Sequence, residues 1–529
     1  MSGRVYASIF QRASNYTPTF FSTASSQSRP THHGHLSSWS NCRSDLLQHS
    51  GEDSEKWSNS QRCFSARQDL HFQPSWVQVN SILRSHEQTV NVPEFDGRGL
   101  SAVRRFQSNQ LAANTPNEDR RSAASCLQSK GMLFGVFDGH GGWACAQAVS
   151  DRLLSYIAVA MMPKHSLDEL EKSMEQGRPL PPILQWHKHH TDLGFHRESS
   201  SLYIDHLRVF WQNLLDSEEH IEGMSPADAL DRAFRQLDAD ISLEAQVPLS
   251  TDLMKSTAIQ VAFAGCTACV AYICTDGIHV ANAGDCRAVL GVQQEDGSWS
   301  ALPLSQDHNS QNQAEVEQVK AKHPPSEKDT IITDDRLLGV LIPLRAFGDM
   351  RFKWSRELQQ SILASLNSGV DLNFLNQYQH IPPNYLTPPY VDVTPEITYH
   401  KLRPQDCFLV LGTDGLWDEL GNEEVVQLVG EHLSGIHLQA PISLSERQLK
   451  LGQMHELLLK RRARSSPALD ANAATHLIRH ALSTDEYGEL SQERLASMLA
   501  LPDDLARMYR DDITATVVYF NSDLARPHS

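Results

Sequence analysis

The sequence predicts an α+β fold, a layered sandwich of antiparallel strands with helices grouped between the strand regions. Three observations support it. Residues 259–304 read almost entirely as strands, and they contain the hairpin dipeptide Asp276-Gly277. Two further apolar runs, at residues 408–411 and 516–520, read as strands. Residues 422–509 are predicted to be mostly helical.

The first core strand is predicted at residues 132–137, a short apolar run that stops before Asp138. A helix follows, since Leu153, Leu154, Ile157 and Ala158 recur at helical spacing and Pro163 ends the pattern. Residues 163–200 are polar and rich in proline around position 180, so we expect an irregular surface insertion there.

Two helices are predicted next. The first carries an apolar stripe formed by Leu207, Phe210, Trp211 and Leu214. The second begins at Ser225-Pro226-Ala227-Asp228, which places serine at the cap and proline in the first helical position. Within residues 259–304, strands are expected at 267–273, 278–283 and 287–292.

Composition narrows the class of protein. The 529 residues are 40% hydrophobic, which is enough for a sizeable core. With 46 Lys and Arg against 64 Asp and Glu, the net charge of −18 argues against a general nucleic-acid binder. No apolar run approaches the roughly 18 residues of a membrane span. Nine scattered cysteines indicate a reducing compartment rather than a disulfide scaffold.

The N-terminal segment differs from the rest of the chain. No Asp or Glu precedes Asp45, whereas Arg4 and Arg12 lie in a Ser-rich, amphipathic start. This composition predicts a mitochondrial transit peptide over residues 1–65, ending near Arg62-Cys63-Phe64-Ser65; the alternative is a plain disordered tail. Residues 66–100 are then a lead-in, 101–522 the main domain with insertions near 163–250 and 350–390, and 523–529 a tail.

Acidic residues stand at the ends of the predicted strands. Any one Asp-Gly is most often only a turn. Strand ends of a sandwich share a rim, however, so these carboxylates can converge, and their repulsion would require a cation. Hard oxygen ligands suit Mg²⁺ or Mn²⁺. The acids are Glu118, Asp119, Asp138, Asp285, Asp414, Asp418, Asp511 and Asp512.

Three other signals are weaker. Cys266 and Cys269 form a Cys-x-x-Cys, but no second pair completes a zinc site, and residues three apart on a strand face opposite sides. His187, His189 and His190 cluster in the polar insertion, where a solvated loop is the simpler interpretation. The basic run at 460–464 is typical of the last turn of a helix, where positive charge is favourable. The alternative is a surface patch that docks an acidic partner.

A series of motifs runs along the chain: Glu118-Asp119, Phe137-Asp138-Gly139-His140-Gly141-Gly142, Ala281-Asn282-Ala283-Gly284-Asp285-Cys286-Arg287, Asp307-His308, Arg345-Ala346-Phe347-Gly348-Asp349, Asp414-Gly415-Leu416-Trp417-Asp418 and Arg510-Asp511-Asp512. Taken in this order, over roughly residues 100–522, they resemble the motif series of the metal-dependent protein Ser/Thr phosphatases of type 2C. The resemblance implies a central β-sandwich of antiparallel sheets flanked by helices, with two Mg²⁺ or Mn²⁺ ions at one rim.

The resemblance also implies roles for single residues. Asp138 would bridge both ions, and the carbonyl of Gly139 would be a further ligand. Asp414 and Asp511 would hold one ion, while Glu118 and Asp119 would serve the other, partly through water. Asp285 and Asp418 match a weaker third site. His140 matches the proposed general acid, and Asp349 belongs to a motif read as structural.

The chemistry expected of such a site is hydrolysis without a phosphoenzyme. Divalent ions can lower the pKa of a water from about 15.7 to about 7. A general acid such as His140 assists departure of the serine oxygen by about 10²–10⁴-fold. Asn114 stands where many members place an arginine that grips the substrate phosphate, so phosphate binding at the ions is expected to be weaker here.

A further set of motifs resembles the mitochondrial branch of this family. They are Ser108-Asn109-Gln110-Leu111, Gln185-Trp186-His187-Lys188-His189, Arg403-Pro404-Gln405-Asp406 and the stretch at 506–514. This resemblance implies a matrix enzyme that acts on the phosphorylated α subunit of pyruvate dehydrogenase. It further implies docking to the lipoyl domain of dihydrolipoyl acetyltransferase with Ca²⁺, and a regulatory subunit. The alternatives are a matrix phosphatase for another substrate, such as branched-chain ketoacid dehydrogenase, and a non-catalytic binding protein on the same fold.

Overall fold

The structure is a computed structural model that describes residues 73–93, 101–129, 131–192, 197–217, 221–249, 251–365, 381–434, 470–484 and 490–521. The predicted transit peptide, residues 66–72 and 94–100 of the lead-in, the basic run at 460–464 and the predicted tail lie outside these residues, as does 366–380 within the second predicted insertion. Among the described residues, no helix has the length and apolar character to cross a membrane.

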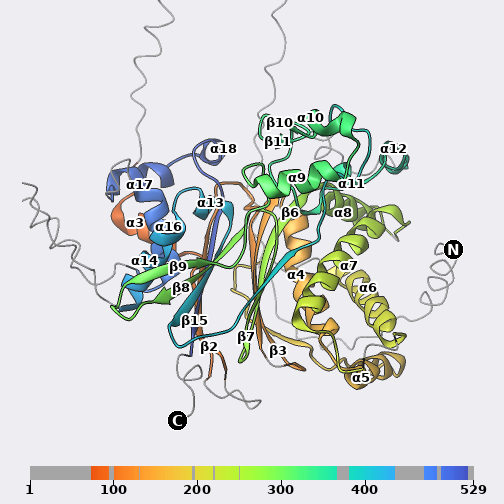
Figure 1. The fold of residues 1–529 in the computed structure, drawn as a ribbon, viewed down its shortest axis with the longest axis horizontal. Coiled ribbons are helices and arrows are strands. Elements are labelled where there is room, and N and C mark those ends of the chain that lie inside the picture. The colour runs from red at the N-terminus through yellow and green to blue at the C-terminus, as the bar shows by residue number, and fades with distance from the viewer. Residues whose placement is uncertain are drawn as a thin grey trace, which may run out of the picture. The chain divides into compact units, whose positions relative to one another are not determined.

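Two antiparallel sheets form the centre of the fold, and helices cover their outer faces (Figure 1). The first sheet has the strand order β1 (Gln88–Asn91), β2 (Val103–Leu111), β15 (Ile513–Phe520), β14 (Asp406–Gly412), β8 (Arg287–Gln293) and β9 (Trp299–Pro303). The second has the order β13 (Glu396–His400), β7 (Gly277–Ala283), β6 (Gly265–Cys274), β4 (Met132–His140), β3 (Arg120–Cys126) and β5 (Leu184–Trp186), with the short β12 (Phe347–Gly348) also paired to β6.

Alternation along the strands builds three hydrophobic layers. In β14, Leu409 and Leu411 face the layer between the two sheets, whereas Phe408 and Val410 face the helices outside. Both faces of this strand are therefore apolar, because both are covered. Cys266 and Cys269 of β6 likewise belong to opposite layers, and both are free thiols.

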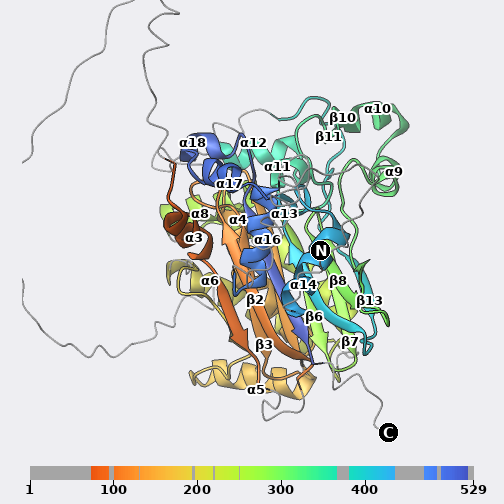
Figure 2. The same ribbon diagram turned by 90° about the vertical axis from the view of Figure 1, so that its left-hand side faces the viewer.

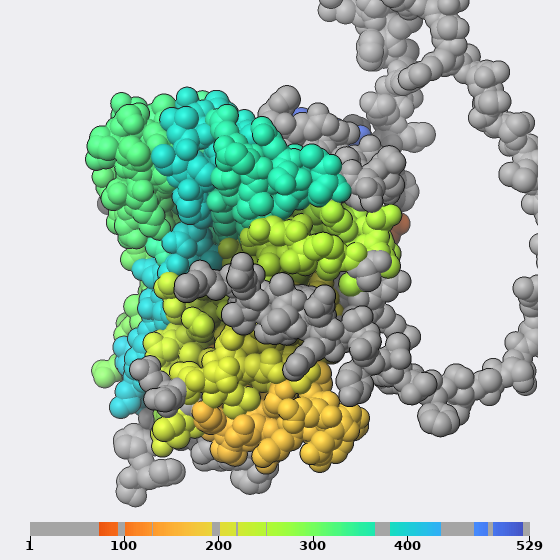
Figure 3. Space-filling model, turned by 90° about the vertical axis from the view of Figure 1, so that its right-hand side faces the viewer, coloured from red at the N-terminus to blue at the C-terminus, as the bar shows by residue number. Residues whose placement is uncertain are grey.

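Helices of the N-terminal half cover the second sheet. They are α4 (Ala144–Ala160), α5 (Lys164–Glu175), α6 (Arg197–Leu215), α7 (Pro226–Gln246) and α8 (Asp252–Phe263). Figure 3 looks at this side, where yellow to yellow-green residues cover the face below the teal segment around 350–365. Ser225 caps α7 as predicted, and its hydroxyl accepts a hydrogen bond from the backbone of Asp228 (3.2 Å).

The first sheet is covered by helices from both ends of the chain (Figure 2). These are α3 (Trp76–Arg84), α13 (Asp414–Trp417), α14 (Asn422–Ser434), α16 (Ala473–Ser483) and α17 (Gln492–Leu499), with the short α18 (Asp503–Ala506) beyond them. A further segment has a core of its own. It contains α9 (Gln313–Ala321), the 3₁₀ turn Pro325–Glu327, α10 (Lys328–Ile331), the hairpin β10 (Ile332–Thr333) and β11 (Arg336–Leu337), α11 (Met350–Lys353) and α12 (Arg356–Ala364).

The predicted fold class is confirmed, and two local expectations are wrong. Residues 259–263 end helix α8 instead of starting a strand, because their apolar side chains pack beneath α4 and α7. The supposedly irregular stretch 163–200 contains α5 and β5. Leu167 and Leu170 of α5 are buried, so this helix is amphipathic and its polar composition hid a narrow apolar stripe.

Candidate metal centre

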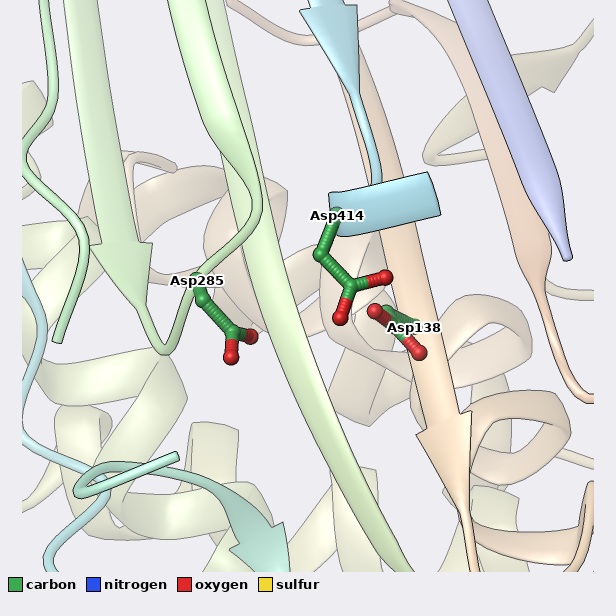
Figure 4. A group of neighbouring side chains, drawn as sticks. All are labelled: Asp138, Asp285 and Asp414. Atoms are coloured by element: carbon green, nitrogen blue, oxygen red, sulfur yellow. The ribbon is translucent and has the colours of Figure 1, made fainter. Parts of the chain in front are cut away.

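Three carboxylates converge at one end of the sandwich. Asp138 lies near the end of β4, Asp285 in the turn between β7 and β8, and Asp414 at the first position of α13, directly after β14. One oxygen of each lies within 4.8 Å of the others. Figure 4 shows that the carboxyl groups of Asp138 and Asp414 face each other and that Asp285 points toward the same space. The sequence predicted that strand ends would bring these three acids together.

The turn that carries Asp285 depends on the glycine before it. Gly284 has a φ of +119°, which side chains rarely adopt, and a Cβ there would lie 2.2 Å from the Cβ of Thr267. Only glycine satisfies both conditions. The turn therefore packs closely against β6, which places Asp285 next to the end of β4.

Mutual repulsion and burial raise the pKa values of these acids. Burial raises the pKa of Asp138 well above its usual value, and the charges of Asp414, Asp119 and Asp285 raise it further. Burial and the charge of Asp414 raise the pKa of Asp285 to about 8. The pKa of Asp414 is raised to about 6, chiefly by burial, with Asp511 and Asp418 contributing. A cluster of this kind is stabilised in its ionised form by a bound cation.

Asp119, whose charge acts on Asp138, is fully buried. Its Oδ2 accepts hydrogen bonds from the hydroxyls of Thr413 (2.8 Å) and Thr514 (2.6 Å). Burial and the charge of Asp512 nevertheless raise its pKa well above the usual value. The sequence interpretation assigned no role to either threonine, although Thr514 ends the motif stretch at 506–514, because both lie far from Asp119 along the chain.

The backbone of Gly139 packs directly against the backbone of Glu118. A Cβ on Gly139 would lie 2.4 Å from the carbonyl oxygen of Glu118, so glycine is required for this approach. The Glu118 side chain is 13% exposed, and its Oε2 lies 3.7 Å from Nη1 of Arg507. Burial raises its pKa, although the charge of Arg507 opposes this.

Asp511 and Asp418 are exposed at the rim, outside the three-carboxylate cluster. Both still act on Asp414, whose pKa their charges raise. The pKa of Asp418 is itself raised by burial of its carboxyl group and by the charge of Asp511. The structure therefore brings Asp418 and Asp511 toward the same carboxylate, Asp418 from the residue after α13 and Asp511 from the residue pair before β15.

Asp512, next to Asp511, anchors the loop that precedes Glu118. Its carboxylate accepts hydrogen bonds from the backbone N–H groups of Ala113, Asn114 and Glu118 and from the side-chain amide of Asn114 (2.9 Å). The donor of Asn114 is thus directed at Asp512. A phosphate contact for Asn114 stays a prediction.

His140 is paired with Asp349, which the sequence interpretation treated as purely structural. Nε2 of His140 lies 2.6 Å from Oδ2 of Asp349. Burial lowers the pKa of His140, but the charge and hydrogen bond of Asp349 outweigh it, so the pKa is raised overall. The signal that could have indicated this pair was the conspicuous acid at the end of the Arg345–Asp349 motif.

The family model for protein phosphatase 2C matches residues 162–453, which include Asp285, Asp414 and Asp418. A mitochondrial [pyruvate dehydrogenase [acetyl-transferring]]-phosphatase 2 from Homo sapiens is 55% identical over 86% of this chain and 85% of its own length.

The chain belongs to the protein phosphatase 2C family. A mitochondrial [pyruvate dehydrogenase [acetyl-transferring]]-phosphatase 1 from Bos taurus is 53% identical over 88% of this chain and 86% of its own. A protein phosphatase 2C homologue from Schizosaccharomyces pombe is 29% identical over 84% of this chain and 85% of its own length. The solved serine-threonine phosphatase 2C from Toxoplasma gondii covers 82% of this chain and 99% of its own at 15% identity, with a TM-score of 0.38, a likeness too low to carry further argument.

Proposed function

We propose that this chain is a Mg²⁺- or Mn²⁺-dependent protein Ser/Thr phosphatase that removes phosphate from phosphoserine on the α subunit of pyruvate dehydrogenase. The observation that carries the reaction class is the convergence of Asp138, Asp285 and Asp414 within 4.8 Å, with pKa values that call for a cation. The substrate is supported by the names of relatives at 53–55% identity. The catalytic domain spans residues 101–522.

The donor set fits two hard divalent ions, because every candidate ligand is an oxygen. Asp138 would bridge the ions and the Gly139 carbonyl would join it. Asp414 and Asp511 would hold one ion, Glu118 and Asp119 the other, and Asp285 with Asp418 a weaker third. When bound, the ions would neutralise the carboxylates and activate a water for attack on phosphorus.

The chain's own residues then determine how each acid acts. The hydroxyls of Thr413 and Thr514 both donate to one oxygen of Asp119, so the orientation of this carboxylate is fixed. Asp512 holds the 113–118 loop by its backbone, which keeps Glu118 at the rim. Both contacts position a carboxylate before substrate arrives.

His140 is proposed to protonate the departing serine oxygen. Because Nε2 is directed at Asp349, Nδ1 is the nitrogen that can serve the leaving group. Donation from Nδ1 while Nε2 still donates to Asp349 requires the imidazolium form, which the raised pKa of His140 favours.

The proposed location is the mitochondrial matrix, supported by the composition of residues 1–65 and by the mitochondrial relatives. Docking to the lipoyl domain of dihydrolipoyl acetyltransferase, support of that contact by Ca²⁺, and a regulatory subunit rest on the resemblance to the mitochondrial branch. These partners would bring the enzyme to its substrate and raise the local substrate concentration.

A direct assay tests the proposal. Phosphate release is measured from phosphorylated pyruvate dehydrogenase with Mg²⁺ or Mn²⁺, with and without the acetyltransferase core and Ca²⁺. Asp138→Asn is the inactive control, and phosphorylated branched-chain ketoacid dehydrogenase is the competing substrate. Equal or faster release from the competing substrate would overturn the substrate assignment but not the reaction class.

A further inference from the structure

A short exposed segment stands beside the metal centre. It follows α18 and consists of Arg507, Met508 and Tyr509; we call it the 507–509 lip. Met508 is 77% exposed and Tyr509 61%, which is unusual for two large apolar side chains in succession. Figures 1 and 2 place α18 at the same end of the sheets as α13, which carries Asp414.

The lip is held in place although its side chains are exposed. Backbone N–H groups of Met508, Tyr509 and Arg510 donate to carbonyls of residues 505 and 506 at 2.9–3.1 Å. Arg510 Nη2 donates to the carbonyl of Ala112 (2.7 Å) and so ties the lip to the loop before Glu118. The position of these side chains at the rim is therefore a property of the fold.

Arg507 is a cation with a weak partner. Its side chain is 58% exposed, and among the described residues its one ion pair is the 3.7 Å contact between Nη1 and Oε2 of Glu118. An exposed pair of this length contributes little to stability. A guanidinium binds a phosphate dianion through two parallel hydrogen bonds, which is a much better partner than one distant carboxylate oxygen.

Asn114 and Arg510 are two other side chains near this rim that carry N–H donors. The side-chain amide of Asn114 donates to Asp512. On Arg510, Nε and Nη1 are buried without a hydrogen-bond partner in the described part of the chain, and the guanidinium interacts with the charges of Asp512 and Asp511. Arg507 is therefore a largely exposed cation next to Glu118, one of the acids predicted to serve an ion.

We propose that the 507–509 lip recognises the phosphoserine segment of the protein substrate, with Arg507 binding the phosphate and Met508 and Tyr509 contacting the residues next to the phosphoserine. This inference rests on the proposed function, because it assigns substrate recognition at the same site. Met and Tyr suit this role, since both are enriched where protein surfaces meet and Met adapts to different neighbours.

The phosphate contact is tested with Arg507→Ala and Arg507→Lys. The matched control is Arg235→Ala on α7, since Arg235 is 56% exposed and pairs with Asp231 at 2.8 Å. The readouts are KM and kcat for p-nitrophenyl phosphate, and binding of inorganic phosphate to the Mn²⁺-loaded protein by calorimetry. Arg507→Ala should raise KM about tenfold and weaken the affinity for inorganic phosphate by the same factor, the loss expected for a charge-assisted hydrogen bond.

In the same experiment kcat should change by less than about twofold, since uniform binding affects KM alone. Arg507→Lys should recover part of the affinity. Mn²⁺ affinity should not fall, because the substitution removes a positive charge near the ions. Phosphate binding by Arg507→Ala equal to that of the Arg235→Ala control would overturn the assignment. The calorimetric readout remains valid even if pyruvate dehydrogenase proves not to be the substrate.

The peptide contact is tested with Met508→Ala, Tyr509→Ala and the double variant. Ile221→Ala is the control, because Ile221 is 67% exposed and lies beside the start of α5. We expect KM for a phosphoserine peptide to rise about fivefold to tenfold in the double variant, the loss of burying two side chains. KM for p-nitrophenyl phosphate should stay unchanged, since it lacks flanking residues.

Two results would overturn the peptide contact. One is an equal effect on the peptide and on p-nitrophenyl phosphate. The other is a change in sedimentation of the double variant without a change in peptide KM, which would identify the lip as a contact between copies of this chain.

Discussion

Nε2 of His140 lies 2.6 Å from Oδ2 of Asp349, although 209 residues separate them in the chain. The start of β6 holds this pair in place. A Cβ on Gly265 would lie 1.9 Å from Nε2 of His140 and 2.3 Å from Oδ2 of Asp349, so no side chain fits there. The imidazole is therefore fixed in orientation by a carboxylate on one side and by backbone on the other.

Asp349→Asn is expected to lower kcat for a phosphoserine substrate by about 10²-fold, because His140 loses its orienting partner and part of its proton affinity. The loss should be much smaller with p-nitrophenyl phosphate, since nitrophenolate departs without a proton. Gly265→Ala should show the same pattern by displacing the imidazole. Equal losses for the two leaving groups would indicate that Asp349 serves only to support the fold.

Asp138→Asn and Asp414→Asn are each expected to abolish nearly all activity while the protein stays folded. These side chains repel one another, so replacing one by a neutral amide should raise the melting temperature of the metal-free protein. Added Mn²⁺ should stabilise the wild type but neither variant. Turnover like that of the wild type in either variant would contradict the two-metal assignment.

The stability of the metal-free protein should fall as pH rises from about 4 to about 8. The pKa of Asp285 is raised from 3.8 to about 8 in the folded state, so in this window the folded state retains a proton that the unfolded state has lost. Each increase in pH therefore favours unfolding, until the folded pKa is passed. Thermal melting in chelator across this range measures the slope, and Asp285→Asn should flatten it.

Asp512→Ala is expected to lower the free energy of unfolding by about 3 kcal/mol, because three backbone N–H groups would lose a charged acceptor. Asn114→Ala removes one side-chain donor and should cost about 1 kcal/mol. Urea denaturation with an unchanged slope measures both. Similar costs for the two variants would mean that the loop before Glu118 is held by other contacts.

Residues 1–65 are expected to direct a fused reporter to the mitochondrial matrix, since their start is basic and lacks acids. The control is the same segment with Arg4 and Arg12 replaced by Glu, which removes the positive amphipathic start. Phosphatase activity of a chain beginning at residue 66 should equal that of the full chain. Cytosolic retention of the unmodified fusion would contradict the predicted location.

The sequence predicted the elements whose signal is local. The run at 132–137 and the cap at Ser225 were readable because apolar periodicity and capping involve neighbours within a few residues. Residues 259–263 were misread because a short apolar run suits a buried strand and a buried helix equally. The end of β4 was also underestimated, since the strand continues through Asp138 to His140 by pairing with β6.

By itself, the sequence determined which acids stand at strand ends, and it predicted that their carboxylates would converge at one rim. Only the tertiary structure decided how each acid is used. Asp119 is held by threonines 294 and 395 residues away, and His140 is oriented by Asp349. Such partners depend on the register between strands and on side-chain packing, and neither leaves a periodic pattern along the chain. The same holds for Arg507, whose place beside Glu118 arises because β15 pairs with β2 and brings the residues before β15 to the loop that follows β2.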